Sequence, residues 1–226
     1  MKLSSKPKFL RTIRSFVRRS GRRTSAQKKA WDNYWAIYGV NAEIGPVDLS
    51  ALFENKNQNF VLEIGFGNGE NLIDCATNDP YSNFVGIEVY PVGIGQCLIN
   101  ANKYNLKNLR LFCADAVDIL NKQIANESLD VINIFFPDPW PKKKHHKRRL
   151  ISEDFISLIE SKLKSNGIVH VCTDWVDYAH DIHVLFKSNK KFKTLEKLPK
   201  RLQTKFEKKG LALGHSIYEF AFQLLR

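Results

Sequence analysis

Apolar and polar residues follow a repeating pattern along most of the chain. Five short apolar runs occupy residues 60–66, 83–90, 109–116, 129–136 and 167–174. Stretches of mixed polarity separate these runs, and those near 69–77 and 91–104 have the spacing of helices. Strands that are apolar on both faces and alternate with helices form a parallel sheet covered on both sides. The pattern therefore predicts an α/β fold with a doubly wound, mostly parallel sheet.

The pattern changes at both ends of the chain. After a charged stretch at 187–209, the run YEFAFQLL at 218–225 predicts a late edge strand or hairpin. Before residue 60, four aromatic residues fall on one face of a predicted helix, namely Trp31, Tyr34, Trp35 and Tyr38. We expect this face to dock on the domain, with stacking on nucleic-acid bases as the alternative. Residues 1–30 are then a basic N-terminal arm, and residues 31–226 a single domain.

Positive charge is concentrated in two segments of the 226-residue chain, which has a formal net charge of +12. Residues 1–31 contain eleven Lys and Arg and residues 141–149 contain six, with no acid in either segment. The remainder is mildly acidic, with 18 basic and 23 acidic residues. Two basic patches on such a body predict a nucleic acid that is held at two places. A solvated tail is the alternative for the N-terminal patch.

Other features of the sequence favour a soluble, cytoplasmic protein without a metal. No apolar run approaches the ~18 residues of a membrane span, and the N-terminus has no apolar secretory segment. The four cysteines form no CxxC pair and no zinc-ligand spacing, so we expect reduced core thiols at Cys75, Cys97, Cys113 and Cys172. The basic, Ser-containing residues 1–31 leave organellar import as an alternative. A monomer and a homodimer are both compatible with the sequence.

A glycine loop follows the first apolar run. LEIGFGNGEN places Gly65, Gly67 and Gly69 between a predicted strand and a predicted helix, where glycine lets the backbone turn tightly and approach a ligand. The GxGxG spacing lacks the third glycine of the dinucleotide fingerprint. A pyrophosphate ligand such as that of NAD is therefore disfavoured.

Three acids accompany the first three predicted strands. Glu63 lies within the first strand, Glu88 closes the second and Asp115 closes the third, so all three are expected at the carboxyl edge of the sheet. Glu88 can accept hydrogen bonds from ribose hydroxyls, Asp115 from an adenine amino group, and Glu63 can face a cationic amino-acid group. This ordered set predicts S-adenosylmethionine as the cofactor, because that molecule has no phosphates for the acids to repel.

The most specific motif is FFPDPWPKKKHHKRRL at residues 135–150. Together with LEIGFGNGEN, GIEVY, CTDW and TKFEKKG, it resembles the bacterial tRNA (guanine-N7-)-methyltransferase family, from about residue 10 to the C-terminus. The resemblance implies a Rossmann-like class I methyltransferase fold with seven strands. It also implies methyl transfer from S-adenosylmethionine to N7 of a guanosine in tRNA, at variable-loop position 46. The sequence departs from the family pattern at Asn68 and Asn71, and at Tyr218 and Glu219, where a more acidic pair is expected.

Residue roles follow from the same resemblance. It implies that Glu63, Glu88 and Asp115 bind the cofactor and that Asp138 lies where the cofactor and catalytic sites meet. It further implies that the nucleotide substrate contacts Lys142, Asp174, Thr204, Lys205, Phe206 and Glu207. The arm is expected to act on RNA alone, so that its removal would hardly change cofactor affinity.

The chemistry of guanine N7 methylation explains why Asp138 should precede a basic run. Guanine N7 has an in-plane lone pair, so methyl transfer needs alignment and no general base, while the purine ring gains positive charge. A fixed carboxylate at Asp138 would stabilise that charge, and the basic run would neutralise RNA phosphates. Trp140 can stack on a base or pack beneath the loop. Three alternatives remain, namely an amino-group (adenine-N6-type) methyltransferase, a non-catalytic RNA-binding protein and an NAD oxidoreductase.

Overall fold

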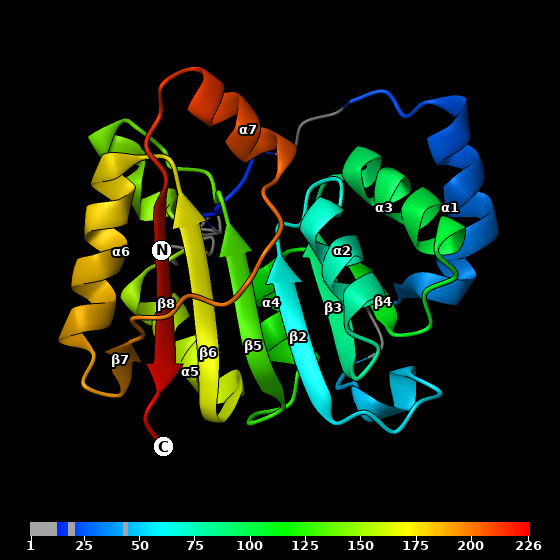
Figure 1. The fold of residues 1–226 in the computed structure, drawn as a ribbon, viewed down its shortest axis with the longest axis horizontal. Helices are drawn as coiled ribbons and strands as arrows, with labels where there is room; N and C mark the ends of the chain where they lie inside the picture. Colours follow the sequence, from blue (N-terminus) through cyan, green and yellow to red (C-terminus); the bar gives the residue numbers. More distant parts are fainter. Residues whose placement is uncertain (1–12, 18–20, 43–44) are drawn as a thin grey trace, which may run out of the picture.

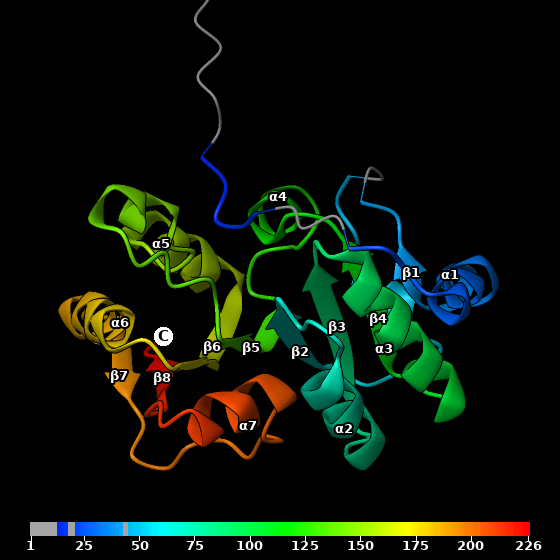
Figure 2. The same ribbon diagram turned by 90° about the horizontal axis from the view of Figure 1, so that it is seen from above.

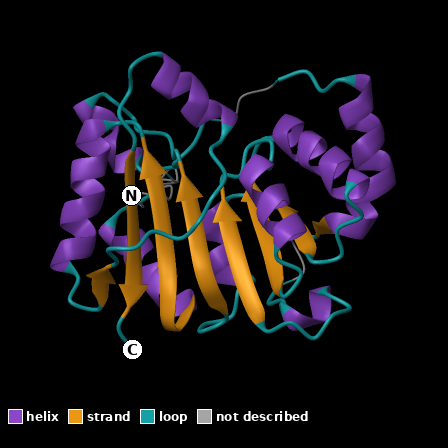
Figure 3. Cartoon of the chain, viewed as in Figure 1, coloured by secondary structure: helices purple, strands orange, loops and turns teal. Residues whose placement is uncertain are grey.

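The computed structural model describes residues 13–17, 21–42 and 45–226 and has the predicted α/β architecture (Figures 1 and 3). In these residues one sheet has the strand order β1-β4-β3-β2-β5-β6-β8-β7. The strands are β1 (Gly39–Val40), β2 (Asn59–Ile64), β3 (Ser82–Glu88), β4 (Leu109–Cys113), β5 (Leu129–Phe135), β6 (Leu163–Thr173), β7 (Phe192–Thr194) and β8 (Tyr218–Leu224). The pairs from β1 to β6 are parallel, and β8 runs antiparallel to both β6 and β7.

Helices cover both faces of this sheet (Figure 2). They are α1 (Ser25–Tyr38), α2 (Glu70–Asn78), α3 (Pro91–Lys103), α4 (Ala116–Lys122), α5 (Glu153–Lys162), α6 (Val176–Ser188) and α7 (Lys205–Ala212), with 3₁₀ turns η1 (Ser50–Leu52) and η2 (Lys143–Arg148). Residues of α4, α5 and α6 share one buried apolar cluster, and those of α1, α2 and α3 share another. Neighbouring strand residues such as Val61 and Leu62 enter opposite clusters, as the period of two in a strand requires. The apolar runs of the sequence are thus explained by burial on both faces.

The order of the strands places a crevice at the carboxyl edge of the sheet. From β2 the chain moves outward through β3 to β4, and then returns to the other side of β2 with β5. Ligands of such sheets bind at this switch point, outside the carboxyl ends of the strands. The glycine loop, Glu88 and the PDPWP segment all follow strands that end there. Figure 1 shows α7 above the same edge.

The sheet differs from the prediction at its two borders. It has eight strands in the described residues rather than seven, because the two-residue β1 pairs with β4. For the run at 218–225 the edge-strand prediction is wrong, because β8 lies between β6 and the shorter β7, whereas its antiparallel pairing with β7 agrees with the hairpin alternative. The pattern of apolar and polar residues does not give the order of strands in a sheet. It also does not predict β7, which is only three residues long.

The aromatic face of the N-terminal helix docks on the domain, as expected. The indole N–H of Trp31 donates to the Pro91 carbonyl over 3.0 Å, and the Tyr38 hydroxyl donates to the Ala101 carbonyl over 3.1 Å, so both bind α3. Trp31 and Trp35 stack on each other with ring centroids 4.4 Å apart. Helix α1 begins at Ser25, inside the segment assigned to the arm, with a capping box between Thr24 and Gln27.

Within the described residues, no helix is both long and apolar enough to cross a bilayer. The four cysteines are free, and Cys97 and Cys172 are fully buried, Cys97 within an apolar cluster and Cys172 beside Glu219. Burial raises the pKa of the Cys75 thiol to about 12. Core thiols, as predicted from their sequence surroundings, are what the structure contains.

Candidate active site

The glycine loop forms one wall of the crevice. Gly65, Gly67 and Gly69 have φ values of 72°, 57° and 76°, in the left-handed region that other residues rarely adopt. A Cβ at Gly69 would lie 2.5 Å from the Cys97 Sγ, so that position also needs glycine for close packing against α3. At Gly65 and Gly67 a Cβ would meet no atom within 4 Å, and the backbone there faces open space. These two glycines leave the loop accessible to a ligand.

Glu88 at the end of β3 holds the loop by backbone hydrogen bonds. One carboxylate oxygen accepts from the Gly67 N–H over 2.8 Å, and the other accepts from Val89 and Tyr90 over 2.6 and 3.0 Å. Burial raises the pKa of Glu88, these donors oppose the shift, and the nearby negative charge of Asp138 adds to it. A carboxylate offers about four acceptor positions. Three backbone donors therefore leave capacity for a ligand hydroxyl.

Asp115 ends the loop after β4 and caps α4. Its side chain accepts from the Val117 N–H over 3.0 Å, which satisfies one of the free donors at the helix start. Partial burial raises the pKa of Asp115, and the positive charge of Arg14 opposes that rise. The second carboxylate oxygen remains available to a ligand donor.

One cavity of about 390 Å³ collects most of the predicted cofactor residues. Gly65, Gly67, Glu88, Asp115 and Asp138 all line it, although they come from four separate segments of the chain. Apolar side chains from the ends of β2, β3 and β5 complete the walls. The cavity thus combines hydrogen-bond acceptors with apolar surface, which suits a nucleoside.

Glu63 and Gly69 lie behind this cavity and do not line it. Glu63 is 4% exposed, and its carboxylate accepts a hydrogen bond of 2.7 Å from the Asn71 amide. Burial raises the pKa of Glu63 to about 7, which the Asn71 donor opposes. A cation that binds near the glycine loop would stabilise the ionised form of Glu63 and so offset much of the desolvation cost of its charge. Glu63 is therefore placed to respond to a positive ligand group beneath the loop.

Asp138 lies in a loop with two unusual backbone conformations. Phe136 and Trp140, on either side of it, have φ values of 54° and 45°, which non-glycine residues seldom adopt. The Phe136 N–H donates to the Cys172 carbonyl over 2.8 Å, and the Arg149 guanidinium donates to the Pro139 carbonyl over 2.9 Å. These contacts fix the loop at both ends. The exposed Asp138 is thereby presented at the mouth of the cavity.

Trp140 packs within the protein, which was one of its two predicted roles. Its indole N–H donates to the Ser15 carbonyl over 2.9 Å, and Arg148 lies over its ring at 4.7 Å. Ser15, Phe16 and Val17 also line the cofactor cavity. This segment of the arm thus borders the cavity, and the effect of removing the arm on cofactor affinity stays a prediction. The basic residues Arg18 and Arg19 lie outside the described residues.

The basic run beyond the loop contains both exposed and buried side chains. Lys142 and its neighbours Lys143 and Lys144 are exposed, as an RNA-binding surface requires. Arg149 is 7% exposed and pairs with Asp181 while bonding Pro139, so it does not face RNA phosphates as predicted. Burial of this last arginine follows from its position next to the apolar Leu150 and Ile151.

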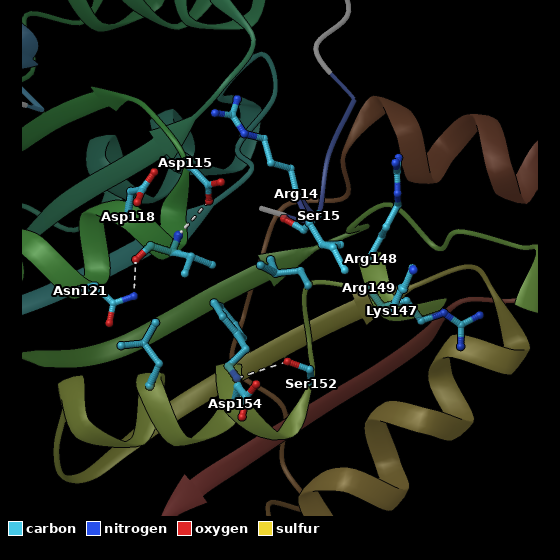
Figure 4. Close-up of a pocket in the computed structure, with 15 residues that line it drawn as sticks. Arg14, Ser15, Asp115, Asp118, Asn121, Lys147, Arg148, Arg149, Ser152 and Asp154 are labelled. Atoms are coloured by element: carbon cyan, nitrogen blue, oxygen red, sulfur yellow. Dashed lines mark hydrogen bonds between the residues drawn. The ribbon is translucent and has the colours of Figure 1, made fainter. Parts of the chain in front are cut away.

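A second cavity of about 510 Å³ adjoins the first (Figure 4). Asp115, Asp118 and Asn121 lie on one side and Lys147 and Arg148 on the other, with Arg14 from the N-terminal segment between them (Figure 4). Asp115 borders both cavities. The positive side of this cavity continues the exposed basic surface toward the cofactor site.

The predicted substrate residues around α7 form a separate group. Asp174 follows β6 and lies 3.1 Å from the His215 ring nitrogen, beyond the end of α7. Thr204 caps α7 by accepting from the Glu207 N–H over 3.2 Å. Lys205 and Phe206 begin the helix, and their side chains lie outside the described part of the chain. Glu207 is 6% exposed and bound to Arg201, so it is turned away from a substrate in this structure.

Sequence reasoning missed Arg201 and did not assign a role to Asn71. Arg201 donates to Glu207 and Glu219, and Asn71 joins Glu63 to the Leu202 N–H. The signal in the sequence was indirect, because Asn71 and Glu219 are two of the positions that depart from the family pattern. Arg201 lies within a charged stretch, and nothing in the sequence around it distinguishes it from exposed basic residues.

The chain is similar to several proteins that are described as methyltransferases. A family model described as "Putative methyltransferase" matches residues 57–220. The tRNA (guanine-N(7)-)-methyltransferase of Yersinia pestis (strain Pestoides F) is 44% identical over 221 residues, covering 95% of this chain and 92% of that protein. The protein of the same name from Nitrosococcus oceani is 45% identical, covering 94% and 91%. The 16S rRNA methyltransferase KamB shares the fold, with a TM-score of 0.58 at 13% identity, covering 83% of this chain and 99% of that one.

Proposed function

The chain belongs to the tRNA (guanine-N(7)-)-methyltransferase family, and from this membership and its cavity we propose that it methylates N7 of a guanosine in tRNA with S-adenosylmethionine. The observation that carries the proposal is the single cavity that joins the glycine loop, Glu88, Asp115 and Asp138. We further propose that the guanosine lies in the variable loop of tRNA and that the reaction takes place in the cytoplasm.

The residues of the cavity fit this cofactor. Glu88 has acceptor capacity for ribose hydroxyls, Asp115 for the adenine amino group, and Glu63 supplies negative charge beneath the loop for the amino-acid end. Gly65 and Gly67 leave space at the backbone, and Gly69 fixes the start of α2. When bound, S-adenosylmethionine supplies an electrophilic methyl group on a sulfonium.

Asp138 is the proposed catalytic residue. Its carboxylate stands at the mouth of the cavity, where a purine would meet the cofactor, and its charge reaches Glu88. N7 attacks through a lone pair in the ring plane, so no proton is removed, and positive charge develops on the purine. A carboxylate held by a rigid loop stabilises that charge without reorganising. The Arg149 and Phe136 contacts supply the rigidity.

The proposed RNA surface surrounds this site. Lys142 to Lys144 provide exposed charge beside Asp138, and residues 1–30 act as an arm that adds to it. Asp174, Thr204, Lys205, Phe206 and Glu207 remain proposed substrate residues on the opposite side. Binding through Glu207 would require its release from Arg201, whereas Asp174 is half-buried beside His215. We therefore assign Thr204 and Glu207 chiefly to the positioning of α7.

The decisive experiment combines labelled S-adenosylmethionine, unmodified tRNA and nucleoside analysis. The expected product is 7-methylguanosine, and a transcript with adenosine in place of the variable-loop guanosine should accept no methyl group. A methylated adenine amino group would support the amino-group alternative. Absence of any product would favour a non-catalytic RNA-binding protein.

The role of Asp138 is tested by Asp138→Asn under single-turnover conditions at saturating cofactor, which separate chemistry from binding. We expect a rate about 10²-fold lower with unchanged tRNA affinity, because the charge is lost and the shape is kept. Asp32→Asn, on the exposed side of α1, is the matched control and should keep the parent rate. Equal rates in both variants would assign Asp138 a loop-shaping role only.

A further inference from the structure

A single buried amide joins the cofactor side of the site to the segment that carries α7. Asn71, in the first turn of α2, is 1% exposed. Its Nδ2 donates to the Glu63 carboxylate over 2.7 Å, and its Oδ1 accepts from the Leu202 N–H over 2.9 Å. Leu202 lies 131 positions along the chain from Asn71. This bridge uses both ends of the amide.

The Leu202 side of the bridge is firmly attached to α7. Arg201 donates to both Glu207 oxygens, over 2.5 and 2.9 Å, and to both Glu219 oxygens, over 2.9 and 2.8 Å. Its side chain is 8% exposed, and that of Glu207 is 7% exposed. Figure 1 shows the segment between β7 and α7 passing across the sheet and rising beside α2. A displacement at Leu202 is therefore transmitted to the first turn of α7.

The strength of the bond between Asn71 and Glu63 depends on the charge of Glu63. A backbone N–H only donates, so Oδ1 must face Leu202, and Nδ2 then faces Glu63. When Glu63 is ionised, the bond from Nδ2 is charge-assisted and strong. When Glu63 is protonated, its carbonyl oxygen still accepts from Nδ2, but the bond is a weaker one between neutral groups. Ionisation of Glu63 therefore tightens the bridge to Leu202.

The surroundings of Glu63 make its charge sensitive to a ligand. Asn71 supplies its hydrogen bond, and the ionisable groups that sense its charge are the thiols of Cys75 and Cys97. Burial raises the pKa of Glu63 to about 7, so both protonation states are populated near neutrality. A cationic amino group beneath the glycine loop would favour the ionised state.

We propose that Asn71 is a positioning residue that couples the amino-acid end of the cofactor to the α7 segment, so that cofactor and tRNA strengthen each other's binding. This inference rests on the proposed function. Because coupling between two binding sites is reciprocal, tRNA must tighten the cofactor by the same factor. Asn71 achieves this without touching the RNA.

The coupling is measured with tRNA binding in the presence and absence of S-adenosylhomocysteine, which has the amino-acid group but no methyl group to transfer. In the parent protein we expect tRNA to bind about fivefold tighter or more when the ligand is present, the lower range of allosteric coupling. The ligand 5′-methylthioadenosine lacks the amino-acid group. It should bind the cavity and leave tRNA affinity unchanged.

Two variants separate the halves of the bridge. Asn71→Leu removes both bonds and should reduce the coupling ratio to about one. Glu63→Gln keeps an acceptor for the Asn71 Nδ2 and the bond from Leu202 but removes the charge, so tRNA affinity without ligand should stay near the parent value while the coupling disappears at saturating ligand. Asn78→Leu changes an exposed residue at the other end of α2 and should keep the parent ratio.

A structural readout tests the bridge independently of the substrate. Hydrogen exchange over residues 199–212 should slow when S-adenosylhomocysteine saturates the parent, and should not slow in Glu63→Gln at saturating ligand. This readout still decides the inference if nucleoside analysis shows that tRNA is not the methyl acceptor. The inference is overturned if 5′-methylthioadenosine couples as strongly as S-adenosylhomocysteine in the parent. Parent-like slowing of exchange in Glu63→Gln would also overturn it.

Discussion

Two pairs of carboxylates near the same edge of the sheet, buried except for the partly exposed Glu219, have opposite electrostatic surroundings. Glu63 and Glu88 receive hydrogen bonds from an amide and from backbone N–H groups, and burial raises the pKa of both. Glu207 and Glu219 share the guanidinium of Arg201. For Glu219 the bonds from Arg201 and His170 outweigh burial, and its pKa is lowered.

The difference shows which carboxylates await a ligand. A buried carboxylate that the protein pairs with a cation is a structural element, because its charge is already compensated. A buried carboxylate held only by neutral donors keeps an uncompensated cost, which a cationic or hydroxyl-bearing ligand can relieve. We therefore propose that the first pair serves the cofactor site, whereas the second pair, bound to Arg201, holds α7 and β8 together.

The largest effect is expected when the protein's own cation is removed. Arg201→Met leaves the buried Glu207 and the partly exposed Glu219 without their partner, and breaking a buried pair such as Arg201–Glu207 costs about 3–5 kcal/mol of unfolding free energy. Denaturant unfolding at pH 7 measures the loss. Arg226→Met is the control, because Arg226 and Glu127 form an exposed pair, worth about 0–1 kcal/mol. Similar losses in both variants would show that the Arg201 cluster is not a special support.

The fold was largely predictable because burial on both faces gives strands a strong signal. The predicted strands at 60–66, 83–90 and 109–116 correspond to β2, β3 and β4, with ends shifted by a few residues. Strand order was not predictable at the C-terminal border, where β8 inserts between β6 and β7. Such an insertion depends on pairing between distant segments, which local periodicity does not encode.

The candidate site was predictable where residue type itself reports chemistry. Glycines between a strand and a helix, acids after successive strands and the PDPWP motif indicated the residues that meet in the cavity. Arg149 and Arg201 were not distinguished from exposed basic residues, because charge runs do not show which member is buried. Asn71 differs from the family pattern, but that difference by itself indicates no role. Its role depends on Leu202, far away in sequence.

A smaller loss is expected on the cofactor side. Glu88→Gln keeps the shape but weakens the acceptors for the Gly67 N–H and for a ribose hydroxyl. Hydrogen bonds to charged groups contribute about 1.5–3 kcal/mol, so cofactor affinity should fall about tenfold or more. Calorimetry with S-adenosylhomocysteine measures this change, and tRNA affinity without ligand should stay constant. Glu153→Gln, exposed on α5, is the control; an unchanged Kd for Glu88→Gln would remove Glu88 from the cofactor site.

The pH dependence of cofactor binding tests Glu63. Since burial raises its pKa to about 7, the folded protein holds this proton more tightly than the unfolded chain. The contribution of Glu63 to the unfolding free energy therefore falls as pH rises from the ordinary glutamate pKa of 4.5 through 7. A bound amino group favours the ionised form, so affinity for S-adenosylhomocysteine should rise roughly tenfold between pH 6 and pH 8. In Glu63→Gln the profile should lose this rise; a parent-like slope would refute the assignment.

The smallest effect is expected for Arg14, a cation near Asp115. Burial raises the pKa of Asp115, and the positive charge of Arg14 opposes that rise. The residues that follow Arg14, namely Ser15, Phe16 and Val17, line the cavity. Arg14→Gln should change cofactor affinity only about twofold, and less at high salt, because exposed charges are screened. Deleting residues 1–17 also removes the cavity wall and the acceptor of Trp140, so it should weaken cofactor binding further and reduce the salt dependence of tRNA binding. If the truncated protein kept the parent Kd for S-adenosylhomocysteine, the cofactor side would be complete without the N-terminal segment, and its carboxylates would depend on the ligand alone for positive charge.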